Sequence, residues 1–287
     1  MLPRILYLCG GGVNTVAHIG VLEELQKEGY LQLIREWAGV SAGSLLAMCL
    51  SAGYTLPECR EFMSGFDFRE VTDPDEAPGW LVHFGFDTGN RLLRLAEVLV
   101  RQKGFASTAT FDDLYKRTAI RLRIYATDLN TGELLEYSAI KTPTYCVAHA
   151  VRASMSIPYY FQPFRCPVTG HLLADGGVYS NFPLHAFSPR ELRDTLAVAF
   201  FHSTERKEEL EMMDICMLPV SILTSARTPS DVRPYLHQTV CVQVGSRSPV
   251  HFDISETERA ELIELGKQAV QEYFTRARKP VRRYSAS

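Results

Sequence analysis

Gly39-Val40-Ser41-Ala42-Gly43 is a Gly-x-Ser-x-Gly pattern that stands between two apolar runs, residues 33–38 and 44–50. Such a pattern between a strand and a helix is typical of a nucleophile elbow, a sharp turn that lifts a serine hydroxyl above the edge of a sheet. Three of the residues around the serine, Gly39, Ala42 and Gly43, are small, as the crowded backbone of this turn requires. The following helix directs its N-terminal N–H groups and the positive end of its dipole towards the same spot. The stretch therefore predicts a reactive serine at position 41.

The residues on either side of this stretch alternate between strand and helix patterns. Residues 4–9 form a short apolar run of strand character, and residues 33–38 form a second one. Between them, residues 16–29 carry apolar side chains at helical spacing, namely Val16, Ile19, Leu22 and Leu25. A helix is also predicted after the turn, over residues 44–52. This succession is typical of a parallel sheet covered by helices, so we expect a three-layer α/β/α fold with a mainly parallel central sheet.

The rest of the chain continues the alternation. Further strands are predicted over residues 120–127, 133–138, 171–174, 195–201 and 240–244. Further helices are predicted over residues 91–101, 111–116, 145–153, 208–223 with a break at Pro219, and 256–276. Residues 66–89 differ, because they are rich in loop-forming residues and have little period. We expect one domain over residues 1–287, with the sequence motifs between about residues 5 and 200, a C-terminal helical extension and a basic tail at residues 276–287.

Composition excludes several classes of protein. The formal net charge of −3 gives no sign of nucleic-acid binding, and no apolar run is long enough to span a bilayer. The first residues lack the basic and apolar regions of a secretory signal. The seven cysteines are scattered without a Cys-x-x-Cys pair, which favours free thiols in a reducing compartment over disulfides or a metal site. These features predict a cytoplasmic protein.

A glycine run, Gly10-Gly11-Gly12, lies between the first predicted strand and its helix. Adjacent glycines let a backbone approach a ligand and turn its N–H groups inward, as a phosphate cradle or an oxyanion hole requires. The Walker pattern fails because no Gly-Lys-Ser/Thr follows, and Thr15 stands where a dinucleotide fingerprint has its third glycine. The oxyanion hole is favoured, because Ser41 follows the next strand and adjacent parallel strands end at one edge.

A third motif, residues 172–177, delivers an aspartate at the end of a short apolar strand. Asp175 is followed directly by Gly176 and Gly177, so the backbone beside it is unhindered. An ordinary Asp-Gly turn is the alternative interpretation.

Taken in order, the glycine run, the serine turn and the Asp-Gly-Gly motif resemble the patatin-like phospholipase family. Further matches are residues 18–22 in the first helix, residues 126–133 at a strand and turn, and residues 153–163 before the aspartate. The resemblance covers roughly the first two-thirds of the chain, the span of one catalytic domain.

The resemblance implies a serine–aspartate dyad without a histidine. Ser41 would be the nucleophile that forms an acyl-enzyme, and Asp175 would accept its proton. The oxyanion hole would consist of Gly10, Gly11 and Gly12, and the supporting glycines would be Gly39, Gly43, Gly176 and Gly177. Family members hydrolyse esters of glycerolipids without calcium, which implies a phospholipid or another acyl-lipid as substrate, no cofactor and no metal. The oligomeric state stays open.

The chain departs from the family pattern where Asn14 and Thr15 replace a basic residue and a final glycine. Thr15 is a candidate N-cap for the following helix. The departure leaves open a lipid-binding or scaffold protein with impaired catalysis. A Ser-His-Asp esterase is a second alternative, with histidine candidates at His171, His185, His202, His237 and His251.

Peripheral membrane contact is a hypothesis with two parts. Four apolar residues of the irregular segment could form a lid over the site or pack beneath the segment: Trp80, Leu81, Phe84 and Phe86. The basic tail could meet anionic headgroups or simply be solvated.

Overall fold

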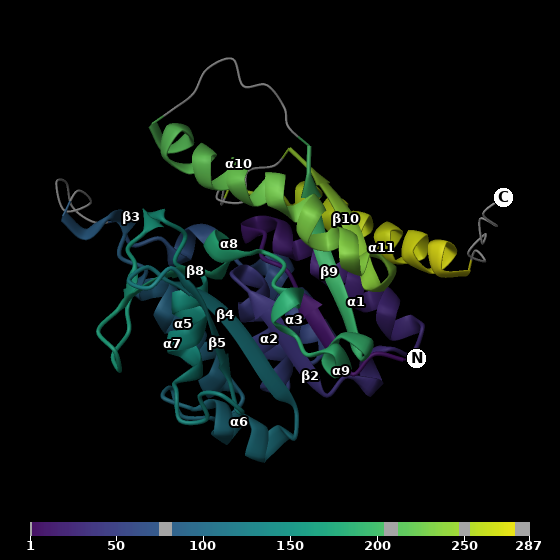
Figure 1. The fold of residues 1–287 in the computed structure, drawn as a ribbon, viewed down its shortest axis with the longest axis horizontal. Coiled ribbons are helices and arrows are strands. Elements are labelled where there is room, and N and C mark those ends of the chain that lie inside the picture. Colours follow the sequence, from purple (N-terminus) through teal and green to yellow (C-terminus); the bar gives the residue numbers. More distant parts are fainter. Residues whose placement is uncertain (1, 75–81, 204–211, 247–252, 279–287) are drawn as a thin grey trace.

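The computed structural model describes residues 2–74, 82–203, 212–246 and 253–278. In this part of the chain, one mixed sheet contains eight strands in the order β10-β9-β1-β2-β4-β8-β7, and β5 pairs with β4. Helices flank the sheet (Figure 1), so the expected α/β architecture is confirmed. The strands of this sheet are β1 (Ile5–Leu8), β2 (Glu36–Val40), β4 (Arg121–Asp128), β5 (Glu133–Ser138), β7 (Phe164–Arg165), β8 (Leu172–Asp175), β9 (Thr195–His202) and β10 (Thr239–Gly245). A second, two-stranded sheet pairs β3 (Gly85–Asp87) with β6 (Tyr159–Phe161).

The five strands from β10 to β4 are parallel, whereas β5 and β8 run antiparallel to β4. Strand β1 pairs with β2 in a register that places Leu8 opposite Gly39. The glycine run after β1 and the serine turn after β2 therefore lie at the same edge of the sheet, as the sequence predicted.

Helices cover both faces of the sheet. The helices are α1 (Ala17–Lys27), α2 (Ala42–Ser51), α3 (Leu56–Gly65), α5 (Asn90–Gln102), α6 (Phe111–Thr118), α7 (Val147–Ser154), α8 (Gly176–Tyr179), α9 (Pro189–Arg193), α10 (Met212–Val232) and α11 (Glu256–Arg278). Helices α2 and α7 pack on the central strands, and α11 lies against α1 and β10. Helix α10 crosses the β9 end of the sheet (Figure 1). The predicted apolar face of α1 is confirmed, because its leucines and isoleucine are fully buried.

Some predicted boundaries and features are wrong. Strand β2 spans Glu36–Val40 instead of residues 33–38, and α2 begins at Ala42 instead of Ser44, so only Ser41 separates strand from helix. Helix α10 runs through Pro219, where the sequence predicted a break. A proline removes one helical hydrogen bond, and the 21-residue helix continues on both sides of that loss.

All seven cysteines are free, as predicted.

Two glycines let α1 and α11 pack in backbone contact. A Cβ on Gly20 would lie 1.8 Å from the carbonyl oxygen of Ile263, and a Cβ on Gly266 would lie 2.1 Å from that of Ala17. Neither position can carry a side chain unless the two helices move apart. This contact attaches the C-terminal helix to the helix that follows the glycine run.

Gly266→Ala is expected to lower the free energy of unfolding by about 2–3 kcal/mol, because overpacking outweighs the better helix propensity of alanine. Equilibrium denaturation by urea measures the change. Gly65→Ala is the matched control, since a Cβ at this helix end meets nothing within 4 Å. A Gly266→Ala protein as stable as the control would contradict the close packing of α1 and α11.

Candidate active site

Ser41 is the single residue between β2 and α2, and its backbone is strained. Its φ is 52° and its ψ is −135°, a backbone conformation that residues with a Cβ rarely adopt. The neighbouring glycines accommodate the sharp turn. A Cβ on Gly39 would lie 2.6 Å from the carbonyl oxygen of Gly43, and a Cβ on Gly43 would lie 2.4 Å from that of Leu8. The turn therefore needs a glycine at both positions.

Hydrogen bonds hold this turn from two sides. The amide of Ser41 donates to the hydroxyl of Ser154 at 2.9 Å, and that hydroxyl donates to the carbonyl of Tyr125 at 2.6 Å. The carbonyl of Ser41 accepts from both the amide and the hydroxyl of Ser44, at 2.8 and 2.6 Å. The serine side chain makes none of these bonds, so they fix the backbone and leave the hydroxyl of Ser41 available.

Asp175 is the last residue of β8, and hydrogen bonds to its backbone amide and carbonyl fix its position. Its amide donates to the carbonyl of Ser156 at 2.8 Å, and its carbonyl accepts from the hydroxyl of Thr127 at 2.9 Å. The side chain is only 6% exposed, and Oδ1 accepts from the amide of Gly177 at 2.7 Å. A Cβ on Gly176 would lie 2.4 Å from Cγ2 of Val40, so a glycine is needed to bring β8 close to the end of β2.

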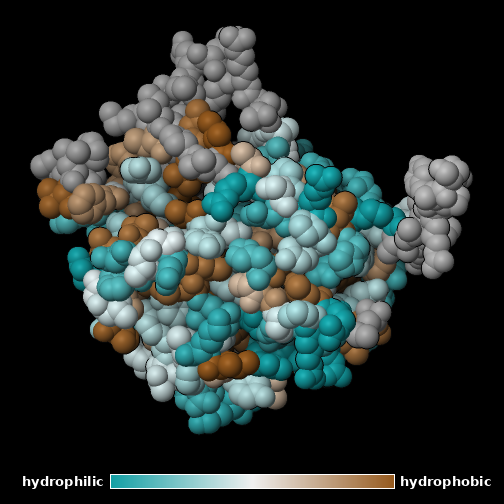
Figure 2. All heavy atoms as spheres, in the orientation of Figure 1, coloured by the Kyte–Doolittle hydropathy of each residue, from teal (hydrophilic) through white to brown (hydrophobic). Residues whose placement is uncertain are grey.

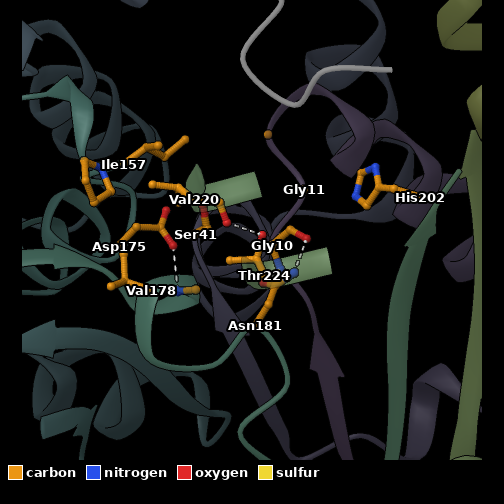
Figure 3. Close-up of a pocket in the computed structure, with 13 residues that line it drawn as sticks. Gly10, Gly11, Ser41, Ile157, Asp175, Val178, Asn181, His202, Val220 and Thr224 are labelled. Atoms are coloured by element: carbon orange, nitrogen blue, oxygen red, sulfur yellow. Dashed lines mark hydrogen bonds between the residues drawn. The ribbon is translucent and has the colours of Figure 1, made fainter. Parts of the chain in front are cut away.

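The carboxylate of Asp175 is a stronger base than an ordinary aspartate. Burial raises its pKa to about 7, although the hydroxyl of Ser41 and the amide of Gly177 each lower it. Its second oxygen, Oδ2, is buried and accepts no hydrogen bond of normal geometry from the described residues. Figure 3 shows Ser41 and Asp175 on the wall of one pocket. A buried carboxylate with one unused oxygen beside a serine can accept a proton from that serine.

The glycine run forms another part of the same wall. The amide of Gly10 donates to Oδ1 of Asn181 at 2.9 Å, so this amide is not available to an oxyanion. The amides of Gly11 and Gly12 donate to no group among the described residues. The Gly10 amide therefore has a partner within the protein, and the predicted oxyanion-hole role of the three glycines stays a prediction that the amides of Gly11 and Gly12 suit best.

Asn14 and Thr15 follow in a 3-10 turn over Gly12–Val16 and are both buried. Neither residue is part of the pocket lining. The suggested capping role of Thr15 is wrong, since Val16 is the residue before α1 and no side chain caps that helix. The departure from the family pattern therefore lies behind the glycine run and not on the wall that meets a substrate.

Two open spaces meet at Ser41. The first is the pocket just described, with about 570 Å³ of atom-free space, whose wall also includes Val220 and Thr224 of α10 (Figure 3). The second is an apolar cavity with about 580 Å³ of atom-free space, lined by side chains such as Leu45, Leu92, Leu95, Met155 and Phe161. Ser41 thus stands between a partly polar pocket and an apolar one.

The histidine candidates within the described residues are not arranged as a triad with Ser41, and of these only His202 is part of the pocket lining. Nδ1 of His171 pairs with Oδ2 of Asp128 at 2.7 Å, but neither residue lines the pocket. His202 does line it, and burial lowers the pKa of His202, which favours the neutral ring. No carboxylate pairs with His202 within the described residues. His251 lies outside them.

Apolar side chains are exposed on two segments near the pocket. Val82 and Phe84, which precede β3, are 66% and 65% exposed, and Leu218 and Ile222 of α10 are 39% and 52% exposed. Figure 2 shows apolar atoms at the surface along α10. Of the four residues expected in a lid, Phe86 is half-buried, whereas Trp80 and Leu81 lie outside the described residues. Whether this surface meets a membrane stays a prediction.

The first residue of the predicted basic tail lies in a helix. Arg276 belongs to α11, where its guanidinium donates to the carbonyls of Leu236 and Thr239 at 3.1 and 2.7 Å. Residues 279–287 lie outside the described chain. None of the helices in the described segments is long and apolar enough to cross a membrane.

The comparisons with known proteins agree with the family resemblance of the sequence. The family model described as patatin-like phospholipase matches residues 6–188, which is more than half of the chain. The chain belongs to the patatin-like phospholipase family. This family includes lipid hydrolases, so the protein is a member of a family of enzymes that hydrolyse lipid esters.

Relatives of this patatin-like protein are distant in sequence. It is 28% identical to the uncharacterized protein YqhO of Bacillus subtilis, over 91% of this chain and 94% of that protein. It is 30% identical to the triacylglycerol lipase ptl3 of Schizosaccharomyces pombe, over 55% of this chain and 33% of that lipase. The structure of VipD from Legionella pneumophila superposes with a TM-score of 0.72 at 16% identity, covering 96% of this chain and 67% of VipD. That likeness shows a shared fold.

Sequence analysis missed three residues that fix this site. Ser154 anchors the amide of the serine turn, Thr127 anchors the carbonyl of Asp175, and Asn181 binds the glycine run. Ser154 and Thr127 stand in segments that carry the family resemblance, and Asn181 follows Asp175 by six positions in the chain. The sequence shows that these residues carry hydroxyl and amide groups, but no periodicity indicates which backbone groups they bind.

Proposed function

We propose that this patatin-like protein hydrolyses carboxylic esters of phospholipids or related glycerolipids through a Ser41–Asp175 dyad. The observation that carries the proposal is the pairing of a strained, available serine with a buried carboxylate whose pKa is about 7. Both groups line one pocket together with Gly11 and Gly12, whose amides have no partner among the described residues. Nucleophile, base and anion-stabilising donors are the parts that acyl transfer requires.

The first half of the reaction forms an acyl-enzyme. Asp175 takes the proton from the hydroxyl of Ser41 while the serine oxygen attacks the ester carbonyl carbon. The carbonyl oxygen gains a negative charge, which the amides of Gly11 and Gly12 stabilise, together with the dipole of α2. The tetrahedral intermediate then collapses, and protonated Asp175 returns the proton to the leaving alkoxide. The products are the alcohol and an ester on Ser41.

The second half repeats these steps with water. Asp175, ionised again, removes a proton from a water molecule whose oxygen attacks the acyl-enzyme. Collapse of the second tetrahedral intermediate returns the proton to the oxygen of Ser41 and releases the fatty acid. One carboxylate therefore serves as base and then as acid in each half, which a pKa near neutrality allows.

The two spaces beside Ser41 fit the two parts of an acyl ester. We assign the acyl chain to the apolar cavity, because burial of each methylene group there contributes about 0.8 kcal/mol. The alcohol part then faces the partly polar pocket beneath α10. A histidine triad is less well supported, since the His171–Asp128 pair lies outside the pocket and His202 lacks a carboxylate among the described residues.

A panel of defined lipids tests the function. The protein is incubated with phospholipids of several headgroups and with mono-, di- and triacylglycerols, and released fatty acids are quantified by mass spectrometry. We expect acyl release from at least one lipid class and covalent labelling of Ser41 by a fluorophosphonate probe. A folded protein that releases no fatty acid and is not labelled would instead support the lipid-binding scaffold.

The apolar lining of the second cavity predicts a chain-length effect. Leu95→Trp fills part of the cavity, so we expect kcat/KM for a hexadecanoyl ester to fall about tenfold or more, while a butanoyl ester changes less than about threefold. Initial rates on a series of p-nitrophenyl esters measure both. Arg94→Trp adds the same side chain to the exposed side of the same helix and serves as control. Equal losses for short and long chains would contradict the assignment of the cavity.

A further inference from the structure

Asn181 joins the segment of the base to the glycine run. It follows α8 by two residues, so a single stretch of seven residues carries both Asp175 and Asn181. Its side-chain Oδ1 accepts from the amide of Gly10 at 2.9 Å, and its Nδ2 donates to the carbonyl of Gly10 at 3.1 Å. Figure 3 shows Asn181 beside Gly10 at the wall of the pocket. One side chain therefore holds both backbone groups of one glycine.

The backbone of Asn181 is itself fixed by hydrogen bonds, so the position of its side chain is well defined. The hydroxyl of the fully buried Tyr7 donates to the carbonyl of Asn181 at 3.0 Å. The two chain neighbours of Asn181 are also bonded to each other. The hydroxyl of Ser180 accepts from the amide of Phe182 at 3.1 Å and donates to Asp231 at the same distance. Phe182 packs edge-on against the ring of Tyr7.

The bond to the carbonyl of Gly10 determines the direction of the next amide. The carbonyl of Gly10 and the N–H of Gly11 belong to one planar trans peptide unit and point in opposite directions. Glycines on both sides of a peptide permit it to rotate at little cost, and Gly10 and Gly11 flank this one. A donor on the carbonyl of Gly10 removes that freedom. The N–H of Gly11 is then held on the side opposite to Asn181.

We propose that Asn181 is a positioning residue that orients the Gly10–Gly11 peptide, so that the amides of Gly11 and Gly12 meet the developing oxyanion. This inference rests on the proposed ester hydrolysis and adds to it a residue that touches neither the nucleophile nor the reacting carbonyl. Because Asn181 and Asp175 share one short segment, the base and the oxyanion donors move as a unit. The carboxylate is thereby kept in register with the site where the negative charge forms.

The chemistry of the side chain explains why asparagine stands here. Only a group with one donor and one acceptor can bind the N–H and the carbonyl of the same residue. The space is also limited, since a Cβ on Gly10 would lie 2.8 Å from Oδ1 of Asn181 and 2.7 Å from Cβ of Ser41. Aspartate has the same size and still accepts from Gly10, but its ionised carboxylate cannot donate to the carbonyl and repels it.

Two variants separate the two bonds. Asn181→Ala removes both, whereas Asn181→Asp keeps the bond from the Gly10 amide and removes only the bond to the Gly10 carbonyl. We expect kcat to fall about 10²–10³-fold in both, the loss that removal of an oxyanion donor produces. We expect KM to change less than about threefold, because the substrate ester is neutral before attack. For Asn181→Asp, the comparison is made on the alkaline plateau, since the added charge raises the pH at which Asp175 ionises.

The affinity for a transition-state analogue is a measurement that would not change if Asn181 had a purely structural role. A trifluoromethyl ketone with the acyl chain of the best substrate adds to Ser41 and places an oxyanion in the same site. Its inhibition constant should rise in parallel with the loss in kcat/KM, while that of the corresponding alcohol, which forms no oxyanion, stays within about threefold. Asn130→Ala is the matched control. It removes a similar bond, from the Leu172 amide at 2.7 Å, at a turn outside the pocket.

The outcomes distinguish this inference from the proposed function. If Asn181→Asp retains wild-type kcat and ketone affinity while Ser41→Ala is inactive, the inference is overturned and the ester hydrolysis stands. If the wild-type protein neither cleaves esters nor binds the ketone covalently, the proposed function fails first. Should Asn181→Ala fold poorly by circular dichroism, Asn181→Asp decides the question alone, because it preserves size and one of the two bonds.

Discussion

Ser41→Ala is expected to reduce fatty-acid release to the background rate, a loss on the order of 10⁴-fold or more. The reason is that the variant has no oxygen to form the acyl-enzyme, although the oxyanion donors and both open spaces persist. Alanine at this position keeps the Cβ and the strained backbone, so the fold should be retained. The measurement compares initial rates on the best lipid of the panel and fluorophosphonate labelling detected by intact mass.

Ser51→Ala is the matched control for this loss. Ser51 is equally buried and stands at the far end of the same helix, α2, away from the pocket. The control should retain wild-type rates and labelling. A Ser41→Ala protein that keeps more than a few per cent of the activity would exclude Ser41 as the nucleophile.

Asp175→Asn is expected to lower kcat about 10³–10⁴-fold, since an amide cannot accept the serine proton. Asp128→Asn provides the matched control, because Asp128 is an equally buried carboxylate on the neighbouring strand, paired with His171. It should change kcat by less than about threefold. If instead Asp128→Asn and His171→Ala abolish activity while Asp175→Asn is active, the esterase triad is correct and the dyad is wrong.

The raised pKa of Asp175 also sets the pH dependence of the reaction. The base must be ionised, so kcat/KM should increase about tenfold per pH unit below pH 7 and reach a plateau above it. A profile measured between pH 5 and 9 on a neutral ester gives the midpoint. A midpoint near the ordinary aspartate pKa of 3.8 would contradict a desolvated base at this position.

The raised pKa of Asp175 also predicts how stability depends on pH, in the direction opposite to that of activity. The folded pKa lies above the unfolded value, so Asp175 binds a proton more tightly in the folded state. Its contribution to stability is therefore full below about pH 4 and is lost as the pH rises through about 7. Asp175→Asn should accordingly unfold at a temperature several degrees higher than the wild type at pH 8, with a smaller difference at pH 5. Activity and stability thus depend oppositely on the ionised carboxylate.

Much of the fold could be predicted because its signals are local. The helical spacing in α1 and the apolar runs of β1 and β9 follow from burial of one helix face or of a whole strand, and a short window of sequence records this. Boundaries were less certain. Strand β2 and helix α2 meet at Ser41, because glycines on either side permit a one-residue turn that propensity does not indicate. Pro219 looked like a break, but one missing hydrogen bond did not end α10.

The site was predictable in its parts more than in its assembly. Gly39, Gly43 and Gly176 were recognised from their motifs, and each one is now seen against a backbone or side chain that a Cβ would strike. The roles of Ser41 and Asp175 stay predictions until the variants are measured. The motif did not indicate that the Gly10 amide has a partner, because that partner comes from a residue 171 positions away.

The sequence by itself determined most of the succession of longer strands and helices, the sharp turn at Ser41 and the family resemblance, because these depend on side-chain size and spacing over a few residues. Tertiary structure alone decided what surrounds the reactive groups. The Asp175 pKa rises because β8 is buried beside β4, and Ser154 reaches the Ser41 amide because α7 packs on the sheet. The Asn181 side chain selects which glycine amides stay free. Burial and hydrogen-bond partners are properties of neighbours in space, and no local pattern records them.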